Sequence, residues 1–264
     1  MKPFLKKIFA ALGLLTRFKY SRFYLWYKRA TDVTVAAAYT KEYNFYASFL
    51  QKGELIFDIG ANDGHKTEVF LHLADKVICC EPDATNYKIL KARFGNNKRV
   101  SIENKAVAKD ETVHTMFVHE EGSAFNTLNA KFKNTLEGDR TNRWDTKVVY
   151  EKEVEINTTT LDHLIQKYGV PGFIKIDVEG YENEVMKGLT QAIPFISIEC
   201  LLPEFEAELL EIIERLEQLQ HNLSFNVAID EKLVFTGFLA KDAFLNYLNE
   251  NPDLAFETII KTEA

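Results

Sequence analysis

The chain has 264 residues, of which 46% are hydrophobic and 27% are charged, so it can form one large α/β domain with a substantial core. No run of 18 apolar residues occurs, and no membrane-spanning helix is expected. Residues 1–30 hold eight basic side chains and no acidic one, which leaves 24 basic and 39 acidic residues, a net charge of −15, for the rest. We expect no nucleic-acid partner, because phosphate contacts supply most of that affinity and an acidic body opposes them.

The basic N-terminal segment is expected to form an amphipathic helical extension over residues 1–38, ahead of a domain at 39–264. The stretch PFLKKIFAALGLLTRFKY, from Pro3, places apolar side chains along one helical stripe flanked by lysine and arginine. The favoured interpretation is packing on the domain or on a second subunit, so an oligomer is an open alternative. Peripheral contact of residues 1–30 with a membrane surface is the second interpretation. A signal peptide is the third, and it lacks a small-residue cleavage site.

Downstream of the extension, short apolar runs alternate with helical patterns, which is typical of a parallel sheet covered by helices on both faces. Four of the runs are almost continuously apolar, as strands buried on both faces are. The expected strands are residues 55–60, 76–82, 100–107, 173–180 and 195–200, with edge strands at 112–118 and 148–156. The expected helices are residues 65–74, 83–94, 160–168 and 181–190. The chain then continues with a helix at 204–220, an antiparallel pair of strands at 223–229 and 232–240, and a last helix near 241–249.

A polar stretch without clear periodicity interrupts this pattern at residues 119–147. A loop of this length in a compact domain is usually functional or disordered, and we predict a lid over the substrate. Ser123 and Asn126 could reach a cofactor or an acceptor, and Trp144 could stack on a sugar ring. Positive charge that would favour an anionic or phosphate-linked acceptor comes from Lys131, Lys133, Arg140, Arg143 and Lys147.

The three cysteines, Cys79, Cys80 and Cys200, lie in apolar runs without the C-x-x-C spacing of a metal site. They are expected to be buried, reduced thiols. This suits a reducing compartment, which we take to be the cytoplasm, with a membrane-peripheral location as the alternative if residues 1–30 bind lipid.

The stretch FDIGANDGH, from Phe57, reads as a strand that runs into a nucleotide-binding turn. A dinucleotide fingerprint, G-x-G-x-x-G, has its second and third glycines where this chain has Asn62 and His65. Asp58 and Asp63 would also repel a pyrophosphate. We therefore expect a ligand with positive charge and no phosphate, such as S-adenosylmethionine. An NAD-type oxidoreductase is the first rival, and a cofactor-binding module without catalysis is the second.

An acid also ends the second strand, because Glu81 follows Gly60 by 21 residues. In a doubly wound sheet an acid at this point holds ribose hydroxyls. Together with the turn, the motifs CCEPD (79–83), ENKAVAKDE (103–111), TTTLDHL (158–164) and FIKIDVEGYENEVMKGL (173–189) resemble the FkbM family of S-adenosylmethionine-dependent methyltransferases. The resemblance covers residues 40–200 or so.

This resemblance implies the class I methyltransferase fold, a doubly wound, Rossmann-like α/β sheet of seven mostly parallel strands in the order 3-2-1-4-5-7-6, with the last strand antiparallel. It also implies O-methyl transfer to a hydroxyl of a sugar, a glycan or a glycosylated small molecule, so the expected partner is a sugar or glycan acceptor, free or lipid-linked. The implied cofactor contacts are Asp58, Gly60, Asn62, Gly64, Glu81, Pro82, Lys105, Ala106 and Asp177.

Three carboxyl groups should face one crevice, because Asp177 and Glu179 end the fourth strand and Glu199 ends the fifth, where ligands bind in such sheets. Methyl transfer needs an aligned acceptor oxygen and a group that removes its proton. Asp177 or Glu179 is the candidate base, Glu199 would bind substrate hydroxyls, and Tyr181 is a further candidate substrate contact. Clustered carboxylates also suit Mg²⁺, but the sequence contains no metal motif, so a divalent metal is the less favoured alternative.

Overall fold

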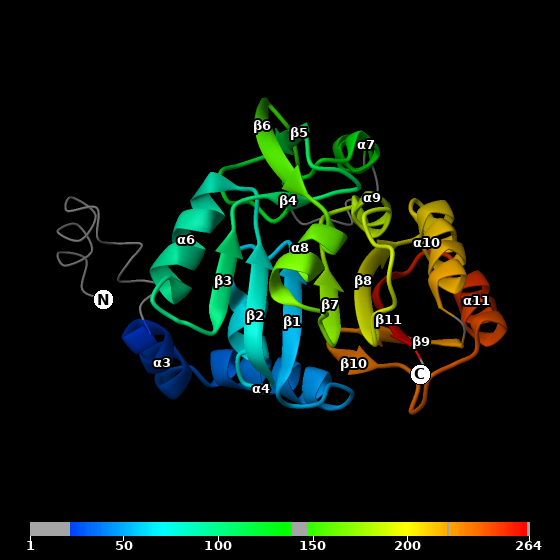
Figure 1. The fold of residues 1–264 in the computed structure, drawn as a ribbon, viewed down its shortest axis with the longest axis horizontal. Coiled ribbons are helices and arrows are strands. Elements are labelled where there is room, and N and C mark those ends of the chain that lie inside the picture. Colours follow the sequence, from blue (N-terminus) through cyan, green and yellow to red (C-terminus); the bar gives the residue numbers. More distant parts are fainter. Residues whose placement is uncertain (1–21, 139–146, 221, 263–264) are drawn as a thin grey trace.

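The computed structural model describes residues 22–138, 147–220 and 222–262. Its main sheet contains the strands β1 (Glu54–Ile59), β2 (Ala74–Cys80), β3 (Val100–Glu103), β7 (Phe173–Ile176), β8 (Phe195–Leu201), β9 (Leu223–Ile229), β10 (Lys232–Leu233) and β11 (Ala255–Thr262). They lie in the order β10-β9-β11-β8-β7-β1-β2-β3 (Figure 1). β11 is antiparallel to both of its neighbours, whereas β3, β2, β1, β7 and β8 are parallel. Apart from the two-residue β10, this is the expected order 3-2-1-4-5-7-6, so the predicted fold class is confirmed.

The strand between β8 and β9 comes from a segment that the sequence analysis did not identify. The strand expected at 232–240 forms only in part. Lys232 and Leu233 pair with β9 as β10, and Leu239 meets β9 again through an isolated bridge to Phe225. The side chain of Asn226 instead donates to the carbonyl oxygens of Phe235 and Gly237, in place of ladder bonds. β11 instead fills the place between β8 and β9 that was expected for residues 232–240. It follows α11 (Lys241–Glu250), which was expected as the last helix.

A second sheet of three strands lies beyond the carboxyl ends of the main strands. It contains β4 (Ala106–Val107), β5 (Val113–Val118) and β6 (Lys152–Thr159) in the order β4-β6-β5. The expected edge strands at 112–118 and 148–156 therefore do not extend the main sheet. The strand expected at 100–107 also divides, because the Asn104 side chain donates to the carbonyl oxygens of Glu81 and Pro82 and turns the chain between β3 and β4.

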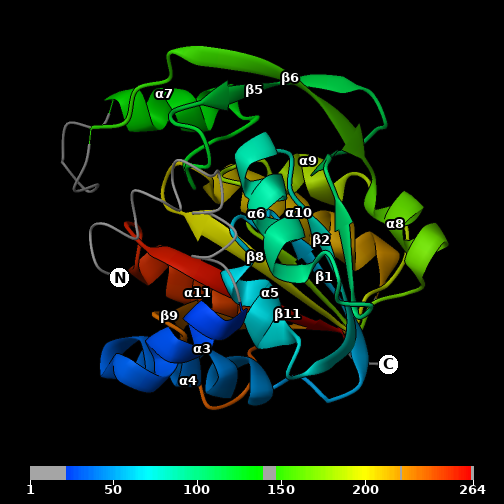
Figure 2. The same ribbon diagram turned by 90° about the vertical axis from the view of Figure 1, so that its left-hand side faces the viewer.

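The predicted lid contains regular structure. Its helix α7 (Ala130–Gly138) begins where Asn129 Oδ1 accepts the backbone N–H groups of Lys131 and Phe132, which is the usual role of asparagine at a helix start. Residues 119–147 were expected to form a long loop, and this expectation is wrong for the part of the segment that forms α7. Figure 2 shows α7, β5 and β6 together above one edge of the main sheet.

Helices cover both faces of the main sheet. α4 (Val33–Ala47), α5 (His65–Phe70) and α6 (Ala84–Phe94) share a core with one face, and α8 (Leu161–Tyr168), α9 (Glu182–Met186), α10 (Glu206–Leu219) and α11 share a core with the other. Successive strand residues alternate between the two cores, as Ile56 and Phe57 do. Cys79, Cys80 and Cys200 are buried free thiols, as expected.

The N-terminal helices α3 (Arg22–Thr31) and α4 precede β1, and α4 crosses the expected domain boundary at 38/39. Tyr46 of α4 is fully buried and packs edge-on against Phe70 and beside Phe173, so α4 belongs to the core. Residues 1–21 lie outside the described residues, and membrane contact by residues 1–30 stays a prediction. Within the described ranges, every helix is too short or too polar to cross a bilayer.

Candidate active site

The turn between β1 and α5 begins the site. Gly60 (φ +80°), Asn62 (φ +48°) and Gly64 (φ +81°) all have left-handed backbone conformations. A Cβ atom on Gly60 would lie 1.8 Å from the carbonyl oxygen of Asp177, so only glycine lets the turns after β1 and β7 approach each other. A Cβ atom on Gly64 would lie 2.5 Å from the Phe94 ring. Gly64 therefore permits packing against α6, and it lines neither of the cofactor-sized pockets described below.

Glu81 fixes this turn from the end of β2. Its Oε2 accepts the backbone N–H of Asn62 and its Oε1 accepts that of Asp83, both at 2.8 Å. Burial raises the pKa of Glu81 to about 7, although the two hydrogen bonds oppose the shift. Each carboxylate oxygen keeps a second lone pair, so Glu81 can still accept hydrogen bonds from two ligand hydroxyls.

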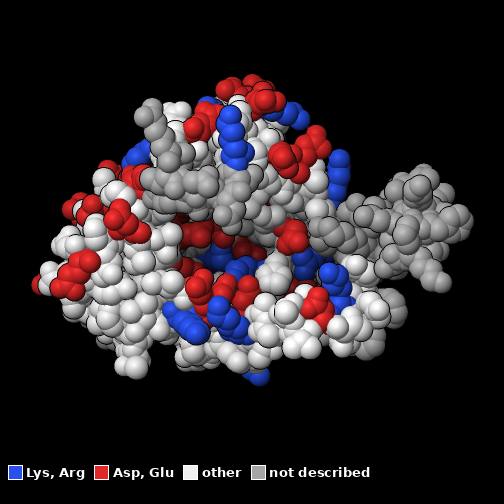
Figure 3. All heavy atoms as spheres, turned by 180° about the vertical axis from the view of Figure 1, so that it is seen from behind, with Lys and Arg blue, Asp and Glu red and all other residues white. Residues whose placement is uncertain are grey.

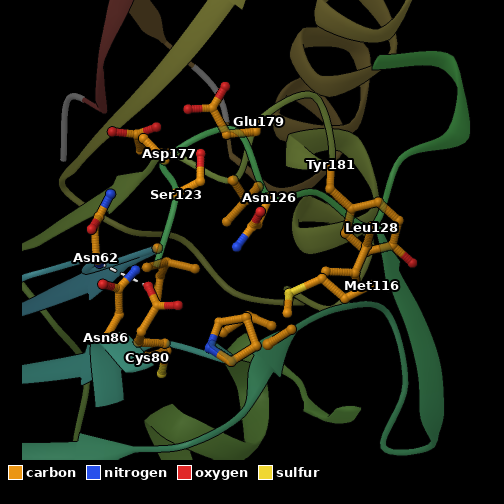
Figure 4. Close-up of a pocket in the computed structure, with 18 residues that line it drawn as sticks. Asn62, Cys80, Asn86, Met116, Ser123, Asn126, Leu128, Asp177, Glu179 and Tyr181 are labelled. Atoms are coloured by element: carbon orange, nitrogen blue, oxygen red, sulfur yellow. Dashed lines mark hydrogen bonds between the residues drawn. The ribbon is translucent and has the colours of Figure 1, made fainter. Parts of the chain in front are cut away.

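The first pocket, here called the Glu81 pocket, is lined by Glu81 and by residues of the small sheet. Figure 4 shows it between Asn62 and Cys80 on one side and Met116 and Leu128 on the other. It holds about 670 Å³ of space free of protein atoms, counted out to its open mouth, a size typical of small-molecule sites. Ala106, Met116 and Leu128 provide an apolar wall. The sequence-predicted residues that it brings together are Gly60, Asn62, Glu81, Pro82, Ala106, Ser123, Asn126, Asp177, Glu179 and Tyr181.

Other predicted residues lie elsewhere. Lys105 does not line the Glu81 pocket, and its Nζ lies 3.9 Å from Glu111. Lys131 and Lys133 of the lid are paired with Glu208 and Glu137, each at 2.5 Å, so they do not offer free positive charge to an acceptor. Trp144, Arg140 and Arg143 lie outside the described residues.

The predicted lid residue Asn126 ties the lid to the domain. Its Nδ2 donates to Asp83 Oδ2 at 3.2 Å and to the Glu120 carbonyl at 2.9 Å, and its Oδ1 accepts the His119 N–H at 2.9 Å. These bonds use most of the capacity of the amide, so Asn126 shapes the Glu81 pocket rather than offering a free group to a ligand.

A wider polar pocket, here called the Asp58 pocket, adjoins the first one and shares Gly60, Asn62 and Asp177 with it. Asp58 is almost completely buried, and its Oδ2 accepts a hydrogen bond from Thr67 Oγ1 at 2.5 Å. Burial raises the pKa of Asp58, while the charge of Lys175 opposes the shift. On the rear face of the molecule, acidic and basic side chains gather around a central hollow (Figure 3).

Polar residues form a row across the α4–α5 face of the main sheet. The strand register places Lys175 beside Asp58 of β1 and Ser197 of β8, and it pairs Glu199 with Glu257 of β11. Lys175 is buried and its Nζ lies 2.5 Å from Asp177 Oδ2. Burial alone would lower the pKa of Lys175, but the carboxylates around it, Asp177 foremost, raise it.

The three predicted catalytic carboxyl groups are brought together as expected: the nearest oxygens of Asp177, Glu179 and Glu199 lie within 4.8 Å of one another. The charge of Lys175 lowers the pKa of Asp177, although burial opposes the shift. The charge of Asp177 and burial raise the pKa of Glu199. Burial and the charge of Asp177 hold the pKa of Glu179 well above its usual value.

Two side chains of the predicted lid form hydrogen bonds with the backbone at Glu179 and Gly180. Thr127 Oγ1 donates to the Glu179 carbonyl at 2.7 Å, and Asn129 Nδ2 donates to the Gly180 carbonyl. Glu179 has φ +55°, a left-handed conformation that costs on the order of 1 kcal/mol for a residue with a side chain. Glu182 Oε1 accepts the N–H groups of Val178 and Gly180, so Glu182 orders this turn.

A third pocket, here called the Phe132 pocket, lies on the other side of Glu179. Its walls include the rings of Phe125, Phe132 and Phe205, and Glu179 and Glu199 lie at its carboxyl-rich end. Aromatic faces beside hydrogen-bonding carboxyl groups can bind a ring with apolar faces and polar edges. The carboxyl cluster thus joins the Glu81 pocket to this one.

The carboxyl cluster is also the one group of acidic, histidine or cysteine side chains within the described ranges whose ligand atoms are close enough together to hold a metal ion. Lys175 already supplies a cation 2.5 Å from Asp177. A divalent metal therefore stays the less favoured alternative.

Four residues of this site were not predicted from the sequence: Lys175, Lys66, Glu42 and Glu257. A signal for Lys175 was present, because it interrupts the otherwise apolar run of β7. Glu257 gave no such signal, because β11 was not expected as a strand and mixes polar with apolar residues. Glu42 could not be found in this way, since it reaches the site from α4 through tertiary packing.

A seven-strand order of this kind, with the antiparallel strand inserted beside the fifth and an acid at the end of the second, defines a Rossmann-like methyltransferase fold. The family model described as the methyltransferase FkbM domain matches residues 58–225, which is more than half of the chain. The chain therefore belongs to the FkbM methyltransferase family. No curated protein matches the sequence.

Solved structures with a similar fold include an rRNA methylase from Streptococcus thermophilus (10% identity, TM-score 0.42, 84% of this chain and 94% of that one covered). A putative methyltransferase from Streptococcus mutans in complex with SAH has 11% identity and a TM-score of 0.40, with 84% and 95% covered. A precorrin-6y C5,15-methyltransferase from Geobacter metallireducens has 11% identity and a TM-score of 0.40, with 87% of each chain covered. The family assignment rests on the sequence match rather than on these structures.

Proposed function

We propose that the protein is an S-adenosylmethionine-dependent O-methyltransferase that acts on a hydroxyl of a sugar, a glycan or a glycosylated small molecule. The observation that carries the cofactor assignment is the Glu81 carboxylate, which is buried, fixed by two backbone N–H groups and still able to accept hydrogen bonds. Two neighbouring ribose hydroxyls match it, and the apolar wall of Ala106, Met116 and Leu128 suits an adenine ring. When bound, the cofactor would supply a methyl group on a positively charged sulfur.

The Asp58 pocket supports the same assignment for the charged part of the cofactor. Asp58 and Asp177 line it with negative charge, which suits an ammonium and a sulfonium and opposes a pyrophosphate. The Asn62 N–H, which a dinucleotide fingerprint would direct at pyrophosphate, is already used by Glu81. Both features count against the oxidoreductase alternative.

Asp177 is the residue that we propose to remove the acceptor proton. It is the ionised member of the cluster, and it lines both cofactor-sized pockets. Transfer of the hydroxyl proton to its carboxylate would leave an acceptor oxygen free to attack the methyl carbon. Lys175 keeps Asp177 charged, and the Glu199 carboxyl group lies within 4.8 Å of it, so these two residues position the base.

The Phe132 pocket supports a sugar-like acceptor. Three phenylalanine rings offer flat apolar surfaces, and the carboxyl groups at the end of the pocket offer acceptors for hydroxyl groups. We propose a cytoplasmic location, with membrane-peripheral attachment as the variant that a lipid-linked acceptor would require.

The first test is calorimetric titration of the full-length protein with S-adenosylmethionine, with S-adenosylhomocysteine and with NAD. We expect both sulfur compounds to bind, Glu81→Gln to weaken both, and Glu153→Gln, at an exposed position on β6, to change neither. Transfer of a labelled methyl group to a panel of sugars would then identify the acceptor. Binding of NAD alone by the folded protein would overturn the proposal in favour of the oxidoreductase.

A further inference from the structure

Two segments outside the matched family domain contact Lys66, a residue that lines the Asp58 pocket. Glu42 belongs to α4 and Glu231 to the turn after β9, whereas the family match covers residues 58–225. Both contact Lys66 of α5: Lys66 Nζ lies 3.0 Å from Glu42 Oε1 and 3.3 Å from Glu231 Oε1. Lys66 itself lines the Asp58 pocket and the polar pocket beside Glu257.

The Asp58 pocket contains more negative than positive charge. Asp58, Asp63, Glu121 and Asp177 line it. These groups suit the ammonium and sulfonium of the proposed cofactor, but its methionyl tail also carries a carboxylate, which would be repelled unless a cation received it.

Three side chains that line this pocket can carry positive charge and could bind an anion. Two of them are already used by a carboxylate partner. Lys175 is buried and its Nζ lies 2.5 Å from Asp177. His65 directs its Nε2 to Glu42 Oε2 at 2.7 Å. Lys66 has three N–H donors for two carboxylate partners, and its side chain is 25% exposed, so it can form one more charged hydrogen bond.

The buried carboxylate of Glu42 holds the Lys66 ammonium in place. It is 7% exposed, a low value for a carboxylate, and it contacts His65 and Lys66 with different oxygens. Burial would raise the pKa of Glu42, but the hydrogen bond from His65 and the charge of Lys66 outweigh it and lower the pKa. Glu42 therefore stays ionised near neutral pH and restricts the Lys66 ammonium to the rim of the pocket.

We propose that Lys66 binds the carboxylate of the cofactor's methionyl tail, and that Glu42 and Glu231 position it from outside the family domain. This inference rests on the proposed function. It makes Lys66 a cofactor-binding residue and Glu42 a positioning residue, and it means that α4 completes the cofactor site of this chain.

The test compares two ligands that differ in the tail. S-Adenosylhomocysteine has the carboxylate, whereas 5′-methylthioadenosine shares the adenosine and sulfur but has no amino-acid tail. For Lys66→Met we expect S-adenosylhomocysteine to bind about tenfold more weakly or worse, as for a lost charge-assisted hydrogen bond, and methylthioadenosine to bind within about twofold of wild type. Lys66→Arg should restore most of the difference, and Glu42→Gln should show a smaller loss of the same selective kind.

The matched control is Lys41→Met, because Lys41 also pairs with Glu231, at 3.2 Å, but lines neither of the two pockets that Lys66 lines. It should leave both affinities unchanged, and circular dichroism checks that each variant is folded. Equal loss of both ligands in Lys66→Met, or loss of neither, overturns the role of Lys66 and leaves the proposed function standing. Failure of both ligands to bind the wild type would overturn the proposed function itself, and this inference with it.

Discussion

The ammonium of the buried Lys175 lies 2.5 Å from the carboxylate of Asp177, two residues along the chain, whose side chain is 31% exposed. Breaking a fully buried ion pair typically costs 3–5 kcal/mol or so, and the partial exposure of Asp177 places this pair at the lower end of that range. We expect Lys175→Met to lower the free energy of unfolding by about 3 kcal/mol, measured by urea denaturation at pH 7.

The double variant Lys175→Met with Asp177→Asn tests whether the two charges interact directly. It should be more stable than the sum of the two single changes predicts, because neither charge is then left alone. Simple additivity of the two losses would contradict a direct coupling between the side chains.

Gly60 is the point of closest approach between the turns after β1 and β7. We expect Gly60→Ala to destabilise the protein by more than about 3 kcal/mol, because the added Cβ meets the Asp177 carbonyl and the left-handed backbone is strained as well. Gly138→Ala is the control, since a Cβ there meets nothing within 4 Å. Thermal unfolding of both variants checks this, and similar midpoints would show that the two turns can separate at little cost.

The raised pKa of Glu81, about 7 against an ordinary 4.5, makes stability depend on pH. Between these values the unfolded chain has lost the proton while the folded protein keeps it, so this group makes stability fall as pH rises from about 4.5 to about 7. Glutamine has no such proton. We expect the stability of Glu81→Gln relative to wild type to improve by up to about 3 kcal/mol between pH 5 and pH 8 in urea denaturation.

The exposed variant Glu153→Gln is the control for this pH effect and should show the same difference from wild type at both pH values. A constant difference for Glu81→Gln would mean that its carboxyl group is ionised throughout this range.

The opposite pKa shifts of Asp177 and Glu199 predict unequal effects of two conservative substitutions. Asp177→Asn removes the ionised group, and we expect methyl transfer to fall about 100-fold or more. Glu199→Gln keeps a hydrogen-bond donor towards Asp177, so its rate should stay within about tenfold of wild type. Initial rates with an identified acceptor measure both, and circular dichroism checks folding. The reverse order of effects would make Glu199 the base.

Much of the fold could be predicted because its strands are buried on both faces. The runs at 55–60, 76–82 and 173–180 carry almost unbroken apolar sequence, and each contains a strand of the main sheet. β11 was missed because its sequence, AFETIIKT, mixes polar with apolar residues, and one of its polar residues, Glu257, pairs with Glu199 in the row of charged side chains on the sheet. Tertiary context, rather than local pattern, decides such a strand.

The candidate site could be predicted where it follows the strand ends. Asp177, Glu179 and Glu199 were placed together from topology alone, and the structure brings their carboxyl oxygens within 4.8 Å. Lys105 could not be excluded from sequence, because the chain leaves β3 for the second sheet at that point and carries the side chain away from the pocket. The contribution of α4 depends on packing between segments more than twenty residues apart, which no local pattern records.

The insertion of β11 between β8 and β9 has a consequence for synthesis of the protein on the ribosome. β9 is made some 25 residues before β11, yet it is joined to the rest of the sheet only through that strand. Until residues 255–262 emerge, β8 and β9 remain two unsatisfied edges, the kind of surface on which nascent chains associate wrongly. A stop codon just upstream of residue 255 should therefore yield insoluble protein.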